Sequence, residues 1–252
     1  SPVAGAQSQQ QQSPAAKIQP KPQRAQNTTP LGTAEAKTQA LELARSAQSL
    51  KDLRTSVESF PGLAIAKTAT NTVFSDGNPH AHVMIVGEAP GAEEDKQGKP
   101  FVGASGQLLD DILGWIGLSR RAEDPLRAVY ISNILNFRPP GNRTPNAGEI
   151  ETSLPFIARH IALIQPAILV LSGGTAAKAL LNTGTGITKL RKQVDNYTHI
   201  YPELAGASGS ICCVPTYHPA FLLRAPQKKR EAWTDMVRLQ QLREMKNLIA
   251  DP

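Results

Sequence analysis

The sequence predicts an α/β fold, a three-layer α/β/α sandwich with a central four-stranded parallel sheet. Four short apolar runs are suited to buried strands, at residues 82–86, 128–132, 168–171 and 210–214. Each run is followed by a stretch with the apolar spacing of a helix. Continuous apolar strands that alternate with helices are typical of a parallel sheet covered on both faces.

Composition limits the class of protein. The 252 residues carry 27 Lys and Arg against 21 Asp and Glu, a net charge of +6. The two cysteines cannot form a disulfide framework or a four-cysteine metal site within one chain. The apolar runs are far shorter than the ~18 residues of a membrane helix, and no basic-then-apolar leader is visible. We therefore expect a mildly basic, cytoplasmic protein without a membrane partner.

The N-terminal region differs from the rest of the chain. Its first 36 residues contain eight Gln, five Pro and no aromatic residue. Such a composition buries too little apolar surface to offset the chain entropy lost on folding. We predict a disordered tail at residues 1–36 and a folded domain at residues 37–252, with helical spacing first visible from about Thr33.

Two helices are expected before the first strand. Apolar residues recur at roughly helical spacing, at Leu41, Ala44, Leu50, Leu53 and Val57. Ser49, with Asp52 three residues later, resembles a capping box that opens the second of these helices. The sequence Pro61-Gly62 is expected to end it.

Later helices are expected at residues 106–118, 174–181 and 227–248, between and after the strands. A further helical stripe runs from Ile150 to Ile164. Thr144 and Pro145 are suited to its N-cap and first turn. Pro155 is expected to kink or restart this helix, because proline cannot donate the backbone hydrogen bond.

Polar and glycine-rich segments follow all four predicted strands, at residues 87–95, 133 with 138–143, 172–175 and 216–219. Open α/β sheets bind ligands at the carboxyl ends of their strands. Because the four segments converge at that edge, we expect the functional site there.

Each of these segments also has a purely structural interpretation. Glu88 can cap a helix, Asn133 can complete a turn, and a single His such as His218 is more often structural than catalytic. The segment 172–178 lacks the Gly-Lys-Ser/Thr triplet of a phosphate loop, which argues against a nucleotide-binding or phosphate-transfer protein. Pro219 favours an extended backbone at His218, and that stiff presentation favours a functional role.

Five segments in order resemble the uracil-DNA glycosylase superfamily. They are Gly87-Glu88-Ala89-Pro90-Gly91, Pro100-Phe101-Val102-Gly103, Tyr130-Ile131-Ser132-Asn133, Arg138-Pro139-Pro140 and His218-Pro219-Ala220. Their order and spacing are most similar to the family 4 branch, the iron–sulfur type of bacteria and archaea. The resemblance extends from about Phe60 to the C-terminal helix and leaves the tail outside.

The resemblance implies a hydrolase that releases uracil from DNA by cleaving its bond to deoxyribose and leaves an abasic site. Glu88 would hold or activate water, and His218 would stabilise the charge that gathers on uracil O2. The implied uracil-binding residues are Gly87, Ala89, Glu94, Phe101 and Asn133. In that set, Phe101 stacks on the base, Asn133 pairs with its polar edge, and Glu94 crowds the position of a thymine methyl group.

The resemblance also implies a monomeric protein of bacterial type that contacts uracil-containing DNA. Leu222 would fill the space of the flipped base, or alternatively belong to the core. Backbone donors to phosphate are expected at Gly173, Gly174 and Thr175. Side chains expected to flank the groove are Asn142, Arg143 and Arg224.

The sequence departs from family 4 at the four cluster cysteines. Those positions fall near Phe60, Leu63, Phe137 and Ser153. The two cysteines present, Cys212 and Cys213, are neighbours in a predicted strand, so their side chains point to opposite faces. We therefore expect no iron–sulfur cluster, no metal and no other cofactor, with an apolar group filling the space. The alternative function is a binding module for uracil-containing or single-stranded DNA that does not cleave it.

Overall fold

The computed structural model describes residues 32–205 and 209–250. Its sheet has six strands in the order β1-β3-β2-β4-β6-β5. The strands are β1 (Asp76–Gly77), β2 (Val83–Gly87), β3 (Val129–Asn133), β4 (Ile168–Ser172), β5 (Asp195–Tyr197) and β6 (Ile211–Thr216). The four central strands are parallel, and the two short edge strands are antiparallel to their neighbours.

The four predicted strands are thus confirmed, but the sheet is larger and mixed. The two strands that were not predicted are short and polar, Asp76–Gly77 and Asp195–Tyr197. An edge strand pairs on one side only, so it needs no continuous apolar run. That is why hydropathy did not reveal either of them.

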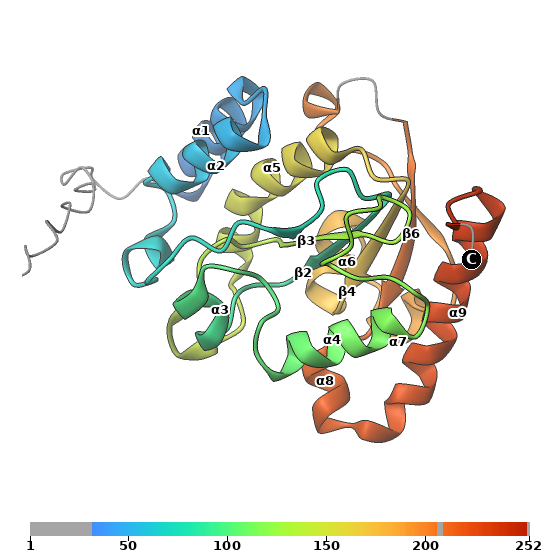
Figure 1. The fold of residues 1–252 in the computed structure, drawn as a ribbon. Coiled ribbons are helices and arrows are strands. Elements are labelled where there is room, and N and C mark those ends of the chain that lie inside the picture. Colours follow the sequence, from blue (N-terminus) through green and yellow to red (C-terminus); the bar gives the residue numbers. More distant parts are fainter. Residues whose placement is uncertain (1–31, 206–208, 251–252) are drawn as a thin grey trace, which may run out of the picture.

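The helices cover both faces of this sheet. They are α1 (Thr33–Ser46), α2 (Leu50–Ser59), α3 (Ala92–Gln97), α4 (Ala104–Gly114), α5 (Ala147–Ile164), α6 (Gly174–Leu180), α7 (Ile187–Leu190), α8 (Pro219–Arg224) and α9 (Lys229–Met245). Figure 1 shows α1, α2 and α5 on one side of the sheet and α4, α8 and α9 on the other. The predicted three-layer arrangement is confirmed.

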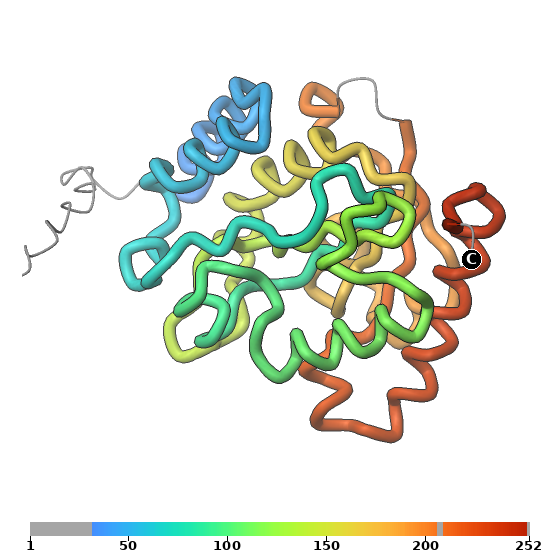
Figure 2. Tube along the Cα trace, viewed as in Figure 1, coloured from blue at the N-terminus to red at the C-terminus, as the bar shows by residue number. Residues whose placement is uncertain are grey.

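The core has two parts, separated by the sheet. Within β2, Met84 and Val86 belong to the cluster under α1, α2 and α5, whereas Val83 and Ile85 belong to the cluster under α4, α8 and α9. This alternation follows from the two-residue side-chain period of a strand. The Cα trace in Figure 2 runs from the blue helices α1 and α2 to the red helix α9 across the sheet.

The start of the domain lies slightly earlier than predicted. Residues 1–31, most of the predicted tail, lie outside the described residues. Residues 33–36 form the first turn of α1, and Ala36 is buried in the core. The boundary at residue 37 is therefore a few residues too late.

The helix ends test the predicted caps. Ser49 accepts a hydrogen bond from the Asp52 amide at 3.1 Å, so the predicted cap of α2 is confirmed. The cap of α5 is Asn146 and not Thr144, since Asn146 accepts from the Glu149 amide and Glu149 accepts from the Asn146 amide. Helix α5 passes through Pro155 without restarting.

No helix within residues 32–205 and 209–250 is long and apolar enough to cross a membrane. Cys212 and Cys213 are free thiols. Burial raises the pKa of the Cys213 thiol well above its usual range. Cys213 therefore behaves as an inert part of the core.

Candidate active site

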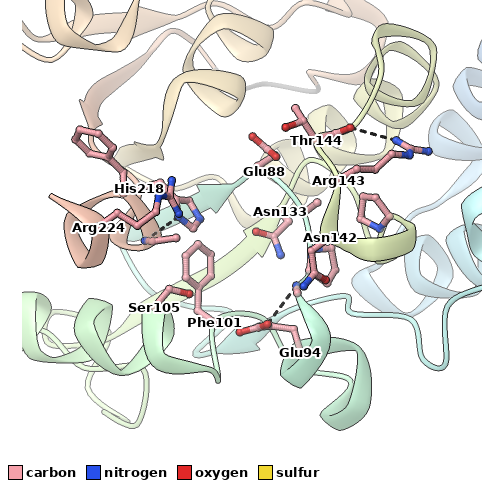
Figure 3. Close-up of a pocket in the computed structure, with 16 residues that line it drawn as sticks. Glu88, Glu94, Phe101, Ser105, Asn133, Asn142, Arg143, Thr144, His218 and Arg224 are labelled. Carbon is pink, nitrogen blue, oxygen red and sulfur yellow. Dashed lines mark hydrogen bonds between the residues drawn. The ribbon is translucent and has the colours of Figure 1, made fainter.

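A cavity of about 500 Å³ opens at the carboxyl ends of β2, β3 and β6. Its lining brings together residues from all of the predicted segments except 172–175. In Figure 3, His218 and Arg224 approach from one side, Asn142 and Arg143 from the opposite side, and Phe101, Asn133 and Glu88 lie between them. The predicted convergence of polar residues at one edge of the sheet is confirmed for three of the four segments.

His218 is held in one orientation at the start of α8. Its Nδ1 accepts a hydrogen bond from the Ala220 amide at 3.1 Å. An accepting Nδ1 carries no proton, so in the neutral ring the proton lies on Nε2, which is a donor. Desolvation, aided by the positive charge of Arg224, lowers the pKa of His218 to about 4. The imidazole is therefore neutral at physiological pH and carries a single donor.

Phe101 lies beside this imidazole in an uncommon backbone conformation. Its ring centroid is 5.3 Å from that of His218, with an angle of 30° between the planes. Its φ of 53° lies in the left-handed region, where a residue other than glycine needs support from its surroundings. That support comes from both sides, since Arg120 donates to the Pro100 carbonyl and Glu94 accepts from the Val102 amide.

Glu94 acts as a clamp on the loops around the cavity. Its Oε1 accepts from the amides of Val102 and Gly103, both at 2.9 Å, and its Oε2 accepts from the Gly91 amide at 3.1 Å. Because backbone donors engage both oxygens, the carboxylate is fixed in place while it lines the cavity. Sequence reasoning assigned Glu94 to the pocket but did not foresee this clamp.

Asn133, the last residue of β3, presents an unpaired acceptor. The residue is buried, and its Oδ1 has no hydrogen-bond partner within the described part of the chain. Such an atom is costly to bury unless a ligand or water satisfies it. Gly87 makes room for this amide, since a Cβ there would lie 2.4 Å from Oδ1 and 2.6 Å from the Phe101 ring. Gly87 therefore shapes the pocket without lining it.

Glu88 directly follows β2 and lines the cavity. Its Oε2 accepts a hydrogen bond from the Thr175 hydroxyl. The neighbouring Ala89 also lines the cavity. Glu88 and His218 therefore contribute a carboxylate and a neutral imidazole to one pocket.

The residues expected to contact DNA fall into three groups. Arg224, Arg143 and Asn142 line the cavity, and Arg224 is exposed. The cavity is not lined by Gly173, Gly174 or Thr175. Gly173 nevertheless lies against His218, since a Cβ added at Gly173 would lie 3.0 Å from the His218 Cβ. The third group is Leu222 alone, which does not lie where it could fill the space of a flipped base.

Leu222 belongs to the core. It is 1% exposed and packs in the cluster under α4, α8 and α9, whereas its neighbour Leu223 is 44% exposed. The rotation of α8 that turns His218, Ala220 and Arg224 toward the cavity turns Leu222 the opposite way. The alternative interpretation, a core residue, describes Leu222 in this structure.

Arg143 is engaged by the helix that follows it. Its guanidinium forms two hydrogen bonds with Glu149, at 2.6 and 2.8 Å. The hydrogen bonds with Glu149 raise the pKa of Arg143 further above its usual range. This pairing ties the loop at the cavity to the capping box of α5. Residues that line the cavity without having been predicted are Pro90, Gly91, Ser105, Pro139, Thr144, Ala220 and Phe221.

The family 4 cluster has no ligands here. Phe60, Leu63 and Phe137 are buried in one apolar cluster, and Ser153 is buried in α5 with its hydroxyl unpartnered among the described residues. No group of three or more His, Cys, Asp or Glu in residues 32–205 and 209–250 is placed to hold a metal ion. Cys212 and Cys213 lie on β6, three strand spacings or about 14 Å from β3, which leads to Phe137. These residues do not fit an iron–sulfur cluster.

Comparison with known proteins agrees with the geometry. The family model for the uracil DNA glycosylase superfamily matches residues 74–237. A type-4 uracil-DNA glycosylase of Pyrobaculum aerophilum is 41% identical over 172 residues, covering 68% of this chain and 82% of that protein. The type-4 enzyme of Archaeoglobus fulgidus is 36% identical over 77% of this chain and 94% of its own length. That of Thermotoga maritima is 38% identical over 62% and 73%.

Proposed function

The chain belongs to the uracil-DNA glycosylase superfamily, and from this premise we propose that it removes uracil from DNA. The reaction would hydrolyse the bond between uracil N1 and deoxyribose C1′, releasing free uracil and leaving an abasic site for base excision repair. The observation that carries the proposal is the cavity that combines the neutral His218, the carboxylate of Glu88 and the unpaired Oδ1 of Asn133.

His218 is suited to stabilise the leaving group. As the N1–C1′ bond breaks, its electron pair moves onto uracil and negative charge gathers on O2. The Nε2–H of His218 is free to donate to that oxygen, because Nδ1 is engaged by the Ala220 amide. One well-placed donor of this kind is typically worth about 3 kcal/mol of transition-state stabilisation.

Glu88 is suited to act on water. In the proposed step, the water oxygen bonds to C1′, and the proton that it loses passes to the Glu88 carboxylate. The negative charge of Glu88 would also stabilise positive charge on the sugar. Uracil takes up a proton from solvent after it leaves, and Glu88 returns its proton to solvent, so the reaction consumes one water and yields uracil and the abasic sugar.

Base recognition is assigned to Phe101 and Asn133. The flipped base would stack on Phe101, whose position is fixed by Glu94 and Arg120. The Asn133 amide offers an acceptor and a donor, which match the N3–H and O4 of uracil. We retain Glu94 as the residue that crowds a thymine methyl group, since its clamped carboxylate cannot readily move away.

We further propose a monofunctional glycosylase that acts as a monomer in the cytoplasm on uracil-containing DNA. None of the described residues that line the cavity is a lysine, so the pocket contains no side-chain amine for covalent capture of the sugar. The exposed Arg224 and the net charge of +6 support attraction to phosphate.

A cleavage assay tests the proposal. The protein is incubated with EDTA and an oligonucleotide that holds one uracil, and alkali then breaks abasic sites. We expect cleavage at uracil and none in a matched oligonucleotide that holds thymine. Binding to uracil-containing DNA without cleavage would overturn the proposal in favour of the non-catalytic binding module.

A further inference from the structure

Thr175 contacts the carboxylate of Glu88 through its side chain. Thr175 is the second residue of α6, and its hydroxyl donates to Glu88 Oε2. The two residues are 87 positions apart in the chain. The role expected for Thr175, a backbone donor to phosphate, makes no use of this hydroxyl.

The sheet brings the two residues together. Strands β2 and β4 are adjacent and parallel, with Val86 opposite Leu171. Glu88 lies two residues beyond Val86, and Thr175 lies four residues beyond Leu171, in the first turn of α6. Both therefore emerge at the same edge of the sheet, and the register of the pairing fixes their meeting.

The hydrogen bond constrains one carboxylate oxygen and leaves the other available. A threonine hydroxyl has a single proton to donate, and Glu88 Oε2 receives it. Within the described residues, Oε1 of Glu88 receives no such bond, and the side chain lines the cavity. A glutamate side chain has several rotatable bonds, so this restraint decides where the free oxygen lies.

We propose that Thr175 is a positioning residue, which holds Glu88 so that its free oxygen meets the attacking water. This inference rests on the proposed function, because it assigns Glu88 to the water. A shift of about 1 Å in a catalytic group can cost roughly a hundredfold in rate. Loss of the hydroxyl therefore acts on the rate of bond cleavage rather than on the binding of DNA.

The test compares four proteins in single-turnover cleavage of a uracil oligonucleotide: wild type, Thr175→Val, Thr175→Ser and Thr183→Val. Valine keeps the shape of threonine without the hydroxyl, and serine keeps the hydroxyl. Thr183→Val is the matched control, because it removes a hydroxyl that bonds to Thr185 and lies outside the cavity. Thermal unfolding confirms that each variant is folded, and Thr175→Ala replaces Thr175→Val if the latter is not.

We expect Thr175→Val to lower the maximal rate roughly tenfold to a hundredfold, with less than about a twofold change in the half-saturating concentration. Thr175→Ser should recover most of the rate, and Thr183→Val should match wild type.

Each contrary result has a distinct meaning. An unchanged rate in Thr175→Val, or no recovery in Thr175→Ser, would overturn the positioning role. A higher half-saturating concentration at an unchanged maximal rate would also overturn it. That result would indicate that the hydroxyl contacts a DNA phosphate. Absence of cleavage by wild type would refute the proposed function itself, and the role of Thr175 with it.

Discussion

Asp235 and His218 are close neighbours, because Thr216 bonds Asp235 and His218 follows Thr216 by two residues. The polar atoms of the two side chains nevertheless have different surroundings. Asp235 in α9 is fully buried, and both of its oxygens are engaged by Arg191, with Thr216 adding a third bond at 2.8 Å. Thr216 ends β6, and His218 follows two residues later with its Nε2 unengaged by the described residues.

The difference separates structural from functional polar groups. Around Asp235 the buried charges are saturated by one another, so the group has no bonding capacity left for a ligand. In the cavity, Asn133 Oδ1 is unpaired, and Glu88 and His218 each keep one atom free. Burial alone therefore does not mark the site, whereas unsatisfied bonding capacity at one cavity does.

Breaking the saturated cluster should give the largest effect on stability. Asp235→Ala removes the fully buried carboxylate that pairs with Arg191 and leaves only the partly exposed Glu231 beside it, which should lower the free energy of unfolding by about 3–5 kcal/mol. Glu231→Ala is the matched control, because Glu231 also pairs with Arg191 but its side chain is 35% exposed, so the loss should be clearly smaller. Urea denaturation measures both, and equal losses would contradict the distinction.

Removing the imidazole of His218 should affect turnover much more than stability. His218→Ala should lower turnover by about a hundredfold to a thousandfold, because one donor to the leaving group is lost. Folding stability should fall by only about 1 kcal/mol, since His218 caps the start of α8 through its bond with the Ala220 amide. The exposed His80 provides the control variant, His80→Ala, which should retain turnover. Wild-type turnover in His218→Ala would remove His218 from the mechanism.

Acid should reveal a second buried histidine that is structural. His160 is 2% exposed, stacks on Phe74 and bonds the Tyr130 hydroxyl at 2.8 Å, while burial lowers its pKa to about 3. Between pH 6.5 and about 3, His160 is protonated in the unfolded chain but stays neutral in the folded protein. Stability should therefore fall with acid by up to about 1.4 kcal/mol per pH unit from this residue.

The variant His160→Gln isolates that contribution, because glutamine cannot titrate but can still bond Tyr130. We expect a shallower loss of stability between pH 6 and 4 in this variant, measured by urea denaturation across that range. An identical pH dependence in the two proteins would show that His160 does not carry the effect.

Ser153 offers the smallest and most local test. Its buried hydroxyl has no partner among the described residues, and Ser153 does not line the cavity. Ser153→Ala should raise the free energy of unfolding by about 1 kcal/mol, since the substitution removes a buried hydroxyl that makes no hydrogen bond. The exposed Ser46, which bonds the Leu43 carbonyl, gives the control Ser46→Ala with no gain. A destabilised Ser153→Ala would indicate that the hydroxyl is satisfied in solution.

Much of the fold was predictable from local pattern. The strands that became β2, β3, β4 and β6 have continuous apolar runs, and the Ser49 cap has a local signature. The edge strands β1 and β5 escaped because polar residues suffice where one side stays unpaired. The start of α5 was misplaced because Asn146 and Glu149 form a better capping pair than Thr144.

The local apolar pattern is enough to predict the order of the strands along the chain and the polar residues that follow each one. Glu88, Asn133 and His218 could be singled out because their places depend only on where a strand ends. Three other features follow from packing between distant segments: Leu222 faces the core, Glu94 clamps the Phe101 loop, and Thr175 bonds Glu88. Helix rotation and strand pairing join atoms far apart in the chain, and no local pattern records which atoms will meet.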